Sequence, residues 1–372
     1  MQDASLYIHI PFCKQACHYC DFHFSTVRST EDSVIAAMLE ELRQAAPSWG
    51  NKKMKSLYFG GGTPSVLAPA VLEQIIQHAT ELFQWQEIVE ITLEANPDDI
   101  TPERLDQWFA LGINRLSVGL QSFNDEELMV MNRAHNATHS LQCLQWINDS
   151  AFRNFTVDLM YGMPGSTVES WQEQLDTLAT FDPPHLSCYA LTVEEKTALH
   201  SKVHKGEIIL PSEETMVEQF TALRGWAVNQ GLQHYELSNF AQPGMHSRHN
   251  SHYWSGAPYL GIGPGAHSFD GKKRSWNISN NTLYARGAAP TSEELTATEL
   301  TNERLMVRLR TAAGFRWKDD LIHPLSAAQR DELDAAISTQ TRLGNLCTTD
   351  LGFHIPPDRW MESDAIIANL FL

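Results

Sequence analysis

Apolar and polar positions follow two alternating patterns along roughly the first two thirds of the chain. Short runs rich in apolar and β-branched residues are typical of buried strands, and they occur at 5–10, 55–61, 90–97, 113–122, 154–164 and 185–192. Between these runs, apolar residues recur every three or four positions, as they do on one face of an amphipathic helix. The helical segments are 31–46, 69–84, 102–111, 134–149, 167–180 and about 213–231.

This alternation predicts an α/β fold with a parallel sheet. Six strand–helix units are too few for a closed eight-stranded barrel, so we expect an open, partial (β/α)6 barrel. Each predicted strand ends in a polar or glycine-rich loop, and the carboxyl ends of parallel strands share one rim. We therefore expect the loop after the first strand to meet the loops at 60–64, 94–97, 119–123 and 158–164.

The remainder of the chain has a different pattern. A strand is predicted near 234–240, where it closes the barrel domain, and the Gly-, Pro- and His-rich segment 242–269 is predicted to be irregular. The basic run "GKKRSW" (271–276) is predicted to be a solvated turn. A helical pattern then restarts, and residues 320–372 predict a small helical module with a short hairpin. The expected domains are a core at 1–240, a connecting segment at 241–295 and a mainly helical C-terminal domain at 296–372.

Charge and hydropathy narrow the class of protein. The 372-residue chain has a formal net charge of −18, which disfavours nucleic acid as a partner because such binding needs clustered Lys and Arg. No apolar run reaches the ~18 residues of a membrane-spanning helix. The N-terminal "MQDASLYIHI" lacks the basic and apolar regions of a secretory signal. We expect a cytoplasmic protein, free or peripheral to the inner membrane, and not an integral membrane protein.

Three of the six cysteines fall within eight residues, at Cys13, Cys17 and Cys20. Clustered thiols in a cytosolic protein indicate metal or redox chemistry rather than disulfides. A 4Fe–4S cluster held by three cysteines leaves one iron open for another ligand. Zinc is the alternative, with His9, His18, His23 or Asp21 as the fourth ligand. The scattered Cys143, Cys188 and Cys347 are expected to be buried, inert thiols.

Five motifs, in order along residues 5–240, resemble those of the radical S-adenosylmethionine (SAM) superfamily. They are "YIHIPFC" (7–13), "FGGGTPS" (59–65), "NRLSVGLQSFN" (114–124), "MNRAH" (131–135) and "DLMYGMPG" (158–165). They are similar, in particular, to the oxygen-independent coproporphyrinogen III oxidase (HemN-like) branch. The resemblance implies that Cys13, Cys17 and Cys20 hold a 4Fe–4S cluster, and that the methionyl group of SAM binds the open iron.

The same resemblance implies a set of SAM contacts, each matched by its position in a motif. They are Tyr7 near the junction with the cluster, Tyr19 beside adenine, Gly61, Gly62 and Thr63 beside the methionyl amine, Glu94 near that amine or the ribose, and Gln121, Arg133 and Asp158 as further polar contacts. Taken singly, each has a structural alternative. The glycines could form a plain turn, Glu94 could cap a helix, and Asp158 could be a buried paired acid.

The chain departs from the oxidases in two places. They carry one more cysteine two residues after the last ligand, where this chain has Phe22, and they have a longer N-terminal arm. Both departures resemble the sister group HemW, which is regarded as a group of haem chaperones. That group also carries an HNxxYW motif, present here as "HNSHYW" (249–254). The resemblance implies that His249 is a haem ligand, and imidazole is a common axial ligand of haem iron.

Two functions remain open at this point. The first is a haem chaperone that carries a 4Fe–4S cluster with SAM and passes haem to an acceptor haemoprotein, such as a membrane-bound respiratory enzyme. The second is a radical SAM enzyme that acts on a porphyrinogen. His246, His252 and His267 are alternative haem ligands near His249. A tRNA-modifying enzyme is disfavoured by the net charge of −18.

Overall fold

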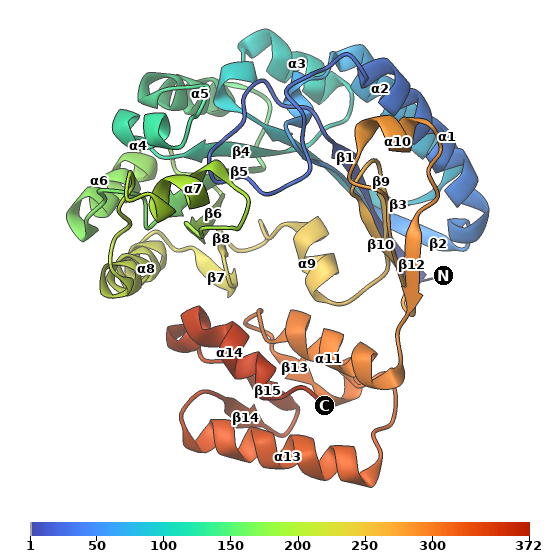
Figure 1. The fold of residues 1–372 in the computed structure, drawn as a ribbon, viewed down its shortest axis with the longest axis vertical. Helices are drawn as coiled ribbons and strands as arrows, with labels where there is room; N and C mark the ends of the chain where they lie inside the picture. The colour runs from blue at the N-terminus through green and yellow to red at the C-terminus, as the bar shows by residue number, and fades with distance from the viewer. Residues whose placement is uncertain (1) are drawn as a thin grey trace.

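The computed structural model describes residues 2–372, and its main feature is a curved sheet of twelve strands. Six strands run parallel in chain order: β1 (Gln2–Ile10), β2 (Lys52–Gly61), β3 (Gln84–Ala95), β4 (Arg115–Gln121), β5 (Phe155–Tyr161) and β6 (His185–Ala190). The predicted partial (β/α)6 barrel is therefore confirmed. Figure 1 shows the sheet as an arc with helices along its convex side.

The helices on the convex side bury an apolar face against the sheet. They are α1 (Glu31–Trp49), α2 (Pro69–Leu82), α3 (Pro102–Ala110), α5 (Ala137–Asp149), α6 (Val168–Ala179) and α8 (Glu213–Asn229). Local chemistry sets their starts. For example, Thr101 accepts the backbone N–H of Arg104 at 3.2 Å, and Pro102 occupies the first turn of α3. Two shorter helices, α4 (Asp125–Val130) and α7 (Ala198–His204), lie near the rim.

The inner face of the arc is lined by polar side chains. They alternate along each strand with apolar side chains, and successive side chains on a strand point to opposite faces of the sheet. On β1 the residues Leu6 and Ile8 are buried under helices, while the alternate residue Tyr7 faces inward. The inward positions are Ser5, Tyr7 and His9 on β1; Ser56 and Tyr58 on β2; Glu90, Thr92 and Glu94 on β3; Arg115 and Ser117 on β4; Thr156 and Asp158 on β5; and His185 and Ser187 on β6. We call the space they surround the lumen.

Two groups of strands extend the arc, and a helix lies in the opening between them (Figure 1). On one side, β8 (Asn239–Ala241) and β7 (Gln233–Glu236) follow β6 in antiparallel pairing. On the other side, β9 (Tyr259–Ile262) pairs in parallel with β1 and leads to β10 (His267–Phe269), β11 (Lys273–Trp276) and β12 (Thr291–Glu294). The helix in the opening is α9 (Arg248–Trp254), which contacts β1 and β2.

Two predictions for this region were wrong. Residues 242–269, predicted to be irregular, contain α9, β9 and β10, and the predicted turn at 271–276 contains β11. The reason is that β9 is stabilised by pairing with a strand at the other end of the chain, with Ser5 opposite Tyr259. Pairing between strands so far apart in the chain produces no pattern in the local sequence from which β9 could be predicted. The seven-residue α9 also lacks an apolar stripe, because two of its histidines face the polar lumen.

The C-terminal residues form a smaller unit below the opening in Figure 1. It contains α11 (Ala297–Arg308), β13 (Phe315–Arg316), α12 (Trp317–Asp320), α13 (Ala327–Arg342), the hairpin β14 (Cys347–Thr349) and β15 (Gly352–His354), and α14 (Ser363–Ala368). The predicted helices and short hairpin are confirmed. Trp360 packs against His234 with ring centroids 4.2 Å apart.

Cys143 and Cys188 are buried as expected, but Cys347 is exposed, so the prediction for that thiol was wrong.

The corner between β9 and β10 depends on a glycine. A Cβ on Gly261 would lie 2.1 Å from the carbonyl oxygen of His267, which is backbone and cannot rotate away. We expect Gly261→Ala to lower the free energy of unfolding by about 1–3 kcal/mol, because the two strands must separate. The matched control is Gly225→Ala on α8, where a Cβ meets nothing within 4 Å. That variant should gain about 0.5–1 kcal/mol. Urea unfolding of both variants tests this, and equal effects would contradict it.

Candidate functional site

The loop between β1 and α1 carries the three clustered cysteines and crosses the carboxyl ends of the strands (Figure 1). Backbone hydrogen bonds shape its base, with Cys13 N–H donating to the carbonyl of Ser25 at 3.0 Å. Lys14 forms ion pairs with Asp98, at 2.8 Å, and with Asp99, just after β3. These contacts hold the loop against the rim, as the parallel topology predicted.

Two of the three sulfur atoms receive hydrogen bonds from the rim. The hydroxyl of Thr63 donates to Cys13 Sγ at 3.3 Å, and Arg133 donates to Cys17 Sγ at 3.3 Å. Burial raises the pKa of Cys13 to about 11 and that of Cys20 to about 12, so both thiols hold their protons in the absence of a cation. Within residues 2–372, no three His, Cys, Asp or Glu side chains are placed to hold a single metal ion.

The donor set and the space around it fit an iron–sulfur cluster. Thiolates are the ligands of such clusters, and hydrogen bonds to their sulfur atoms tune the reduction potential. A Cβ on Gly62 would lie 2.8 Å from the carbonyl oxygen of Ile10 and 3.0 Å from Cys13 Sγ. Gly62 therefore lets the second loop lie directly against the cysteine loop. Arg133 also has a buried Nε without a hydrogen-bond partner among the described residues.

Two carboxyl groups face this rim from neighbouring strands. Glu94 accepts hydrogen bonds from the Tyr58 hydroxyl at 2.8 Å and from the Gly61 N–H at 3.2 Å. Asp158 accepts one from the Ser117 hydroxyl at 3.1 Å. Burial raises the pKa of each carboxyl group to about 7, so each favours a ligand that brings positive charge or hydrogen-bond donors.

Arg133 ties several of the predicted residues together. Its guanidinium donates to Asn96 Oδ1 at 2.9 Å, to the Gly119 carbonyl at 2.6 Å and to the Tyr19 hydroxyl at 3.2 Å. Gln121 takes a left-handed conformation with a φ of 69°, which is uncommon outside glycine. Its amide lies over Gly119, where an added Cβ would be 3.0 Å from Gln121 Nε2. The left-handed turn thus directs the side chain back over the rim.

The structure brings nearly all predicted site residues to one region. Tyr7 stacks on Tyr58 with centroids 6.1 Å apart, and its hydroxyl is 3.1 Å from His9 Nδ1. The residues gathered around the cysteine loop are Tyr7, Tyr19, Gly61, Gly62, Thr63, Glu94, Gln121, Arg133 and Asp158. Sequence reasoning missed Tyr58 and Asn96 as partners of Glu94 and Arg133. Tyr58 lies two residues before Gly60 on β2, so strand alternation places both on the same face of the sheet. That alternation was the signal in the sequence that could have identified Tyr58.

His249 lies deeper, inside the lumen. Its Nδ1 is 2.9 Å from the hydroxyl of Ser56, and its ring lies 4.7 Å from that of Tyr58. Ser56 precedes Gly60 by four residues on β2, which corresponds to about 13 Å along a strand. His249 is therefore separated from the cysteine loop, but Tyr58 connects it to Glu94. Of the motif's other residues, Tyr253 packs against Tyr259, with centroids 5.4 Å apart.

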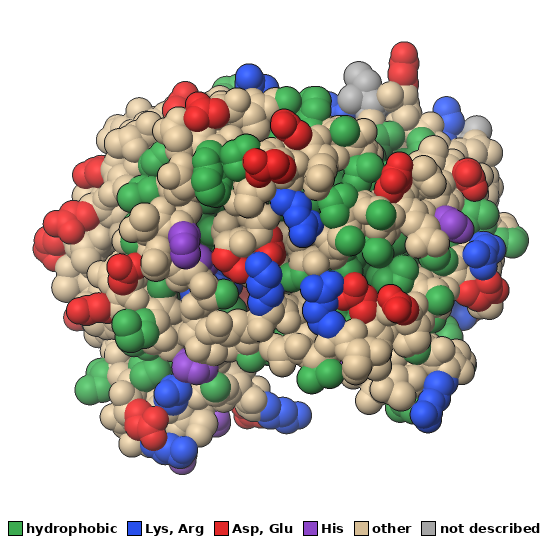
Figure 2. Space-filling model, turned by 90° about the horizontal axis from the view of Figure 1, so that it is seen from above, with side chains coloured by type: hydrophobic (Ala, Val, Ile, Leu, Met, Phe, Trp, Pro, Cys, Tyr) green, Lys and Arg blue, Asp and Glu red, His purple; other side chains and the backbone are tan. Residues whose placement is uncertain are grey.

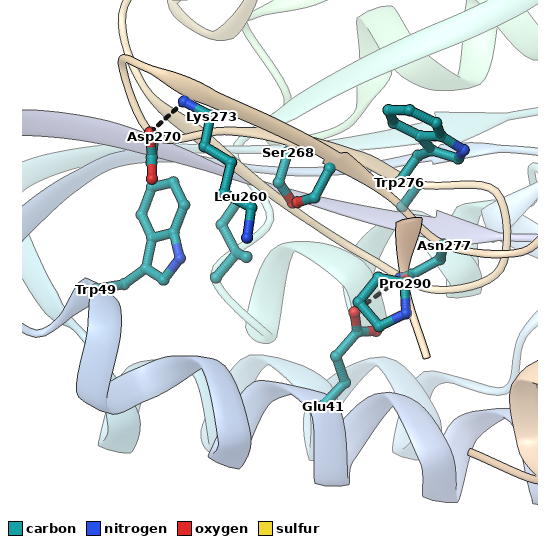
Figure 3. A pocket seen from close by; sticks show the side chains of 11 residues that line it. Glu41, Trp49, Leu260, Ser268, Asp270, Lys273, Trp276, Asn277 and Pro290 are labelled. Carbon is teal, nitrogen blue, oxygen red and sulfur yellow. Dashed lines mark hydrogen bonds between the residues drawn. The ribbon is translucent and has the colours of Figure 1, made fainter. Parts of the chain in front are cut away.

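A separate cavity of about 170 Å³ lies on the opposite face of the sheet, between α1 and the strands β9 to β11 (Figure 3). Trp49 and Trp276 are among the residues that line it. Glu41 points into it from α1 and accepts hydrogen bonds from Asn277 at 2.7 Å and from the Gly263 N–H at 3.0 Å. No predicted site residue lines this cavity, so it is distinct from the cysteine loop and from the lumen.

The fold and the three-thiol loop place the chain in a class of proteins. A model of the Radical SAM superfamily matches residues 7–178. The heme chaperone HemW of Bacillus subtilis is 34% identical over 318 residues, which cover 83% of this chain and 84% of that protein. The HemW of Mycobacterium tuberculosis is 30% identical over 347 residues, which cover 91% and 88%. The chain therefore belongs to the HemW family of the radical SAM superfamily.

A solved structure agrees with this fold along the whole chain. The coproporphyrinogen III oxidase HemN from Escherichia coli superposes with a TM-score of 0.85 at 22% identity, covering 100% of this chain and 90% of that one. Membership of the superfamily implies a 4Fe–4S cluster and SAM.

Among residues 2–372, no helix combines the length and the apolar character needed to cross a membrane. On the face shown in Figure 2, acidic side chains are widely scattered.

Glu94 should make stability depend on pH. Its pKa is raised from 4.5 to about 7, so between these values this carboxyl group holds its proton in the folded protein and loses it in the unfolded chain. The contribution of Glu94 to the free energy of unfolding should therefore fall as pH rises through this window. We expect Glu94→Gln to remove this contribution, and so to gain stability relative to the wild type at pH 8 compared with pH 5.

Urea unfolding of the cluster-free protein at both pH values measures the effect. Glu81→Gln, at an exposed position on α2, is the matched control and should leave the slope unchanged. A constant difference between Glu94→Gln and the wild type at the two pH values would show that the carboxyl group titrates normally.

Proposed function

We propose that this protein is a haem chaperone built on a radical SAM scaffold. It binds haem in the lumen and passes it to an acceptor haemoprotein. The relatives named heme chaperone HemW support this reading, since they match most of the chain at 30–34% identity. The observation that carries the proposal is that the open, polar lumen contains both the residues around the cysteine loop and His249, joined through Tyr58.

The cysteine loop is proposed to hold the cluster and SAM. Cys13, Cys17 and Cys20 would be the ligands of the cluster, and its open iron would be available to the methionyl group of SAM. The SAM-binding residues are Tyr7, Tyr19, Gly61, Gly62, Thr63, Glu94, Gln121, Arg133 and Asp158. Their chemistry suits this ligand, since carboxyl groups accept bonds from an ammonium or from ribose hydroxyls, and a guanidinium pairs with a carboxylate. The cluster and SAM supply redox and binding chemistry that governs haem loading or release.

His249 is proposed to be the axial ligand of the haem iron. Burial lowers its pKa to about 3, so the imidazole is neutral at ordinary pH and keeps a lone pair for iron. Tyr58 and Tyr7 lie beside it, with centroids 4.7 and 6.4 Å from its ring, and offer flat apolar faces to a porphyrin. His252 and His246 have other partners, in Ser5 and Gln233.

The wider arrangement completes the proposal. We propose residues 1–240 as the core domain, 241–295 as a connecting segment whose strands β9 to β12 extend the sheet of the core, and 296–372 as the C-terminal domain. Because α9 lies between the lumen and the C-terminal unit, movement of that unit would open a route for haem. We place the protein in the cytoplasm, free or peripheral to the inner membrane, where it would meet a membrane-bound acceptor.

Haem titration of the reconstituted protein tests the central role of His249. We expect the wild type to bind about one haem per chain, and His249→Ala to bind at least ~10-fold more weakly, because loss of a ligand costs more than loss of its outer partners. His246→Ala is the matched control, since that imidazole bonds Gln233 and not the lumen serines, and it should bind haem normally. Cys17→Ala should lose the cluster.

Optical and electron paramagnetic resonance spectra report haem and cluster separately. If the cluster forms but haem binding is absent, or is the same in His249→Ala, the chaperone proposal fails. Turnover of coproporphyrinogen with SAM would then become the relevant assay, because the alternative function is an enzyme of that type.

A further inference from the structure

Four side chains in the lumen form one continuous hydrogen-bonded chain. Ser5 and Ser56 are opposite each other on the paired strands β1 and β2, and their hydroxyl oxygens are 3.0 Å apart. Ser56 Oγ is 2.9 Å from Nδ1 of His249, and Ser5 Oγ is 2.7 Å from Nδ1 of His252. The two histidines are three residues apart on α9, so they reach into the lumen from the same face of that helix.

The direction of this chain follows from the serine pair, in which Ser56 is the donor and Ser5 the acceptor. Each hydroxyl has one proton to donate. Ser56 donates its proton to Ser5, so Ser56 can only accept from His249, and the proton of that imidazole must sit on Nδ1. Ser5 keeps its own proton, which it can donate to Nδ1 of His252. The second nitrogen of His249, Nε2, then carries no proton and keeps its lone pair.

We propose that Ser56 and Ser5 are positioning residues that hold His249 in the Nδ1–H form and present its Nε2 to the haem iron. This inference rests on the proposed function and adds to it the residues that select the tautomer and orientation of the ligand. Metal-bound histidines usually donate their other N–H to an outer partner, which fixes the ring and raises its basicity. Here the partner is a serine hydroxyl backed by a second serine and a second histidine.

The surroundings of this chain are rigid enough for such a role. Ser5 is 1% exposed and Ser56 is 0% exposed, so water does not compete for their hydroxyls. The first turn of α9 is fixed by Glu90, whose carboxylate accepts the backbone N–H groups of Arg248 and His249, each at 3.0 Å.

Ser56→Ala and Ser5→Ala test the inference from two sides. Ser56→Ala removes the acceptor for Nδ1–H. Ser5→Ala leaves that acceptor in place but frees the Ser56 proton, which can then be donated to Nδ1, so that the His249 proton moves to Nε2. We expect both variants to bind haem about 10-fold more weakly or worse, within the range seen for outer partners of metal ligands.

Three controls separate this effect from folding. Ser56→Thr keeps a hydroxyl and should retain haem affinity if it folds. Ser140→Ala removes an equally buried serine on α5, outside the lumen, and should leave haem binding unchanged. In the His249→Ala background, Ser56→Ala should produce no further loss. Circular dichroism confirms the fold of each variant, and the reduction potential of the bound haem provides a readout beyond affinity.

The outcomes distinguish this inference from the proposed function. If His249→Ala weakens haem binding while Ser56→Ala and Ser5→Ala leave both affinity and reduction potential unchanged, the serine relay is wrong and the chaperone proposal stands. If His249→Ala itself has no effect, the haem site is elsewhere and both proposals are overturned. A loss in the serine variants that persists unchanged in the His249→Ala background would likewise overturn the relay.

Discussion

The curved sheet does not close on itself, and the polar groups along its inner face must therefore find partners within the molecule. Burying a polar group without a hydrogen bond costs more free energy than most packing interactions supply. The helix α9 meets this need at the open side. Glu90 on β3 accepts the first N–H groups of that helix, while Ser5 and Ser56 bond its two histidines. The position of His249, and with it the proposed haem site, depends on this pairing.

The same constraint links the lumen to the rim. Tyr58 lies between the rim and His249, since its hydroxyl donates to Glu94 and its ring lies against that of His249. A change at the cysteine loop that alters Glu94 therefore acts on a side chain that touches His249. This connection offers a physical route by which cluster and SAM binding could influence haem without a shared ligand.

Much of the fold could be predicted from the sequence because its signals are local. The six strand–helix units have clear periodicity, and parallel topology alone brings the Gly61 loop, Glu94 and Asp158 to one rim. The pairing of β9 with β1 could not be predicted, because it joins residues about two thirds of the chain apart. The distance of His249 from the cysteine loop could not be predicted either, because a sequence motif identifies residue types and not their positions along the lumen. The left-handed conformation of Gln121 is another feature that no local pattern in the sequence indicates.

The most direct test is iron anomalous diffraction from crystals of the haem-loaded, cluster-reconstituted protein. We expect iron at two separate sites in each chain, the four irons of the cluster at one and the haem iron at the other. One should lie at Cys13, Cys17 and Cys20, and the other should lie in the lumen within bonding distance of His249 Nε2, about 13 Å further along the strands. A haem iron on the outer surface, or one bound by a different side chain while His249 still bonds only Ser56, would contradict the central claim.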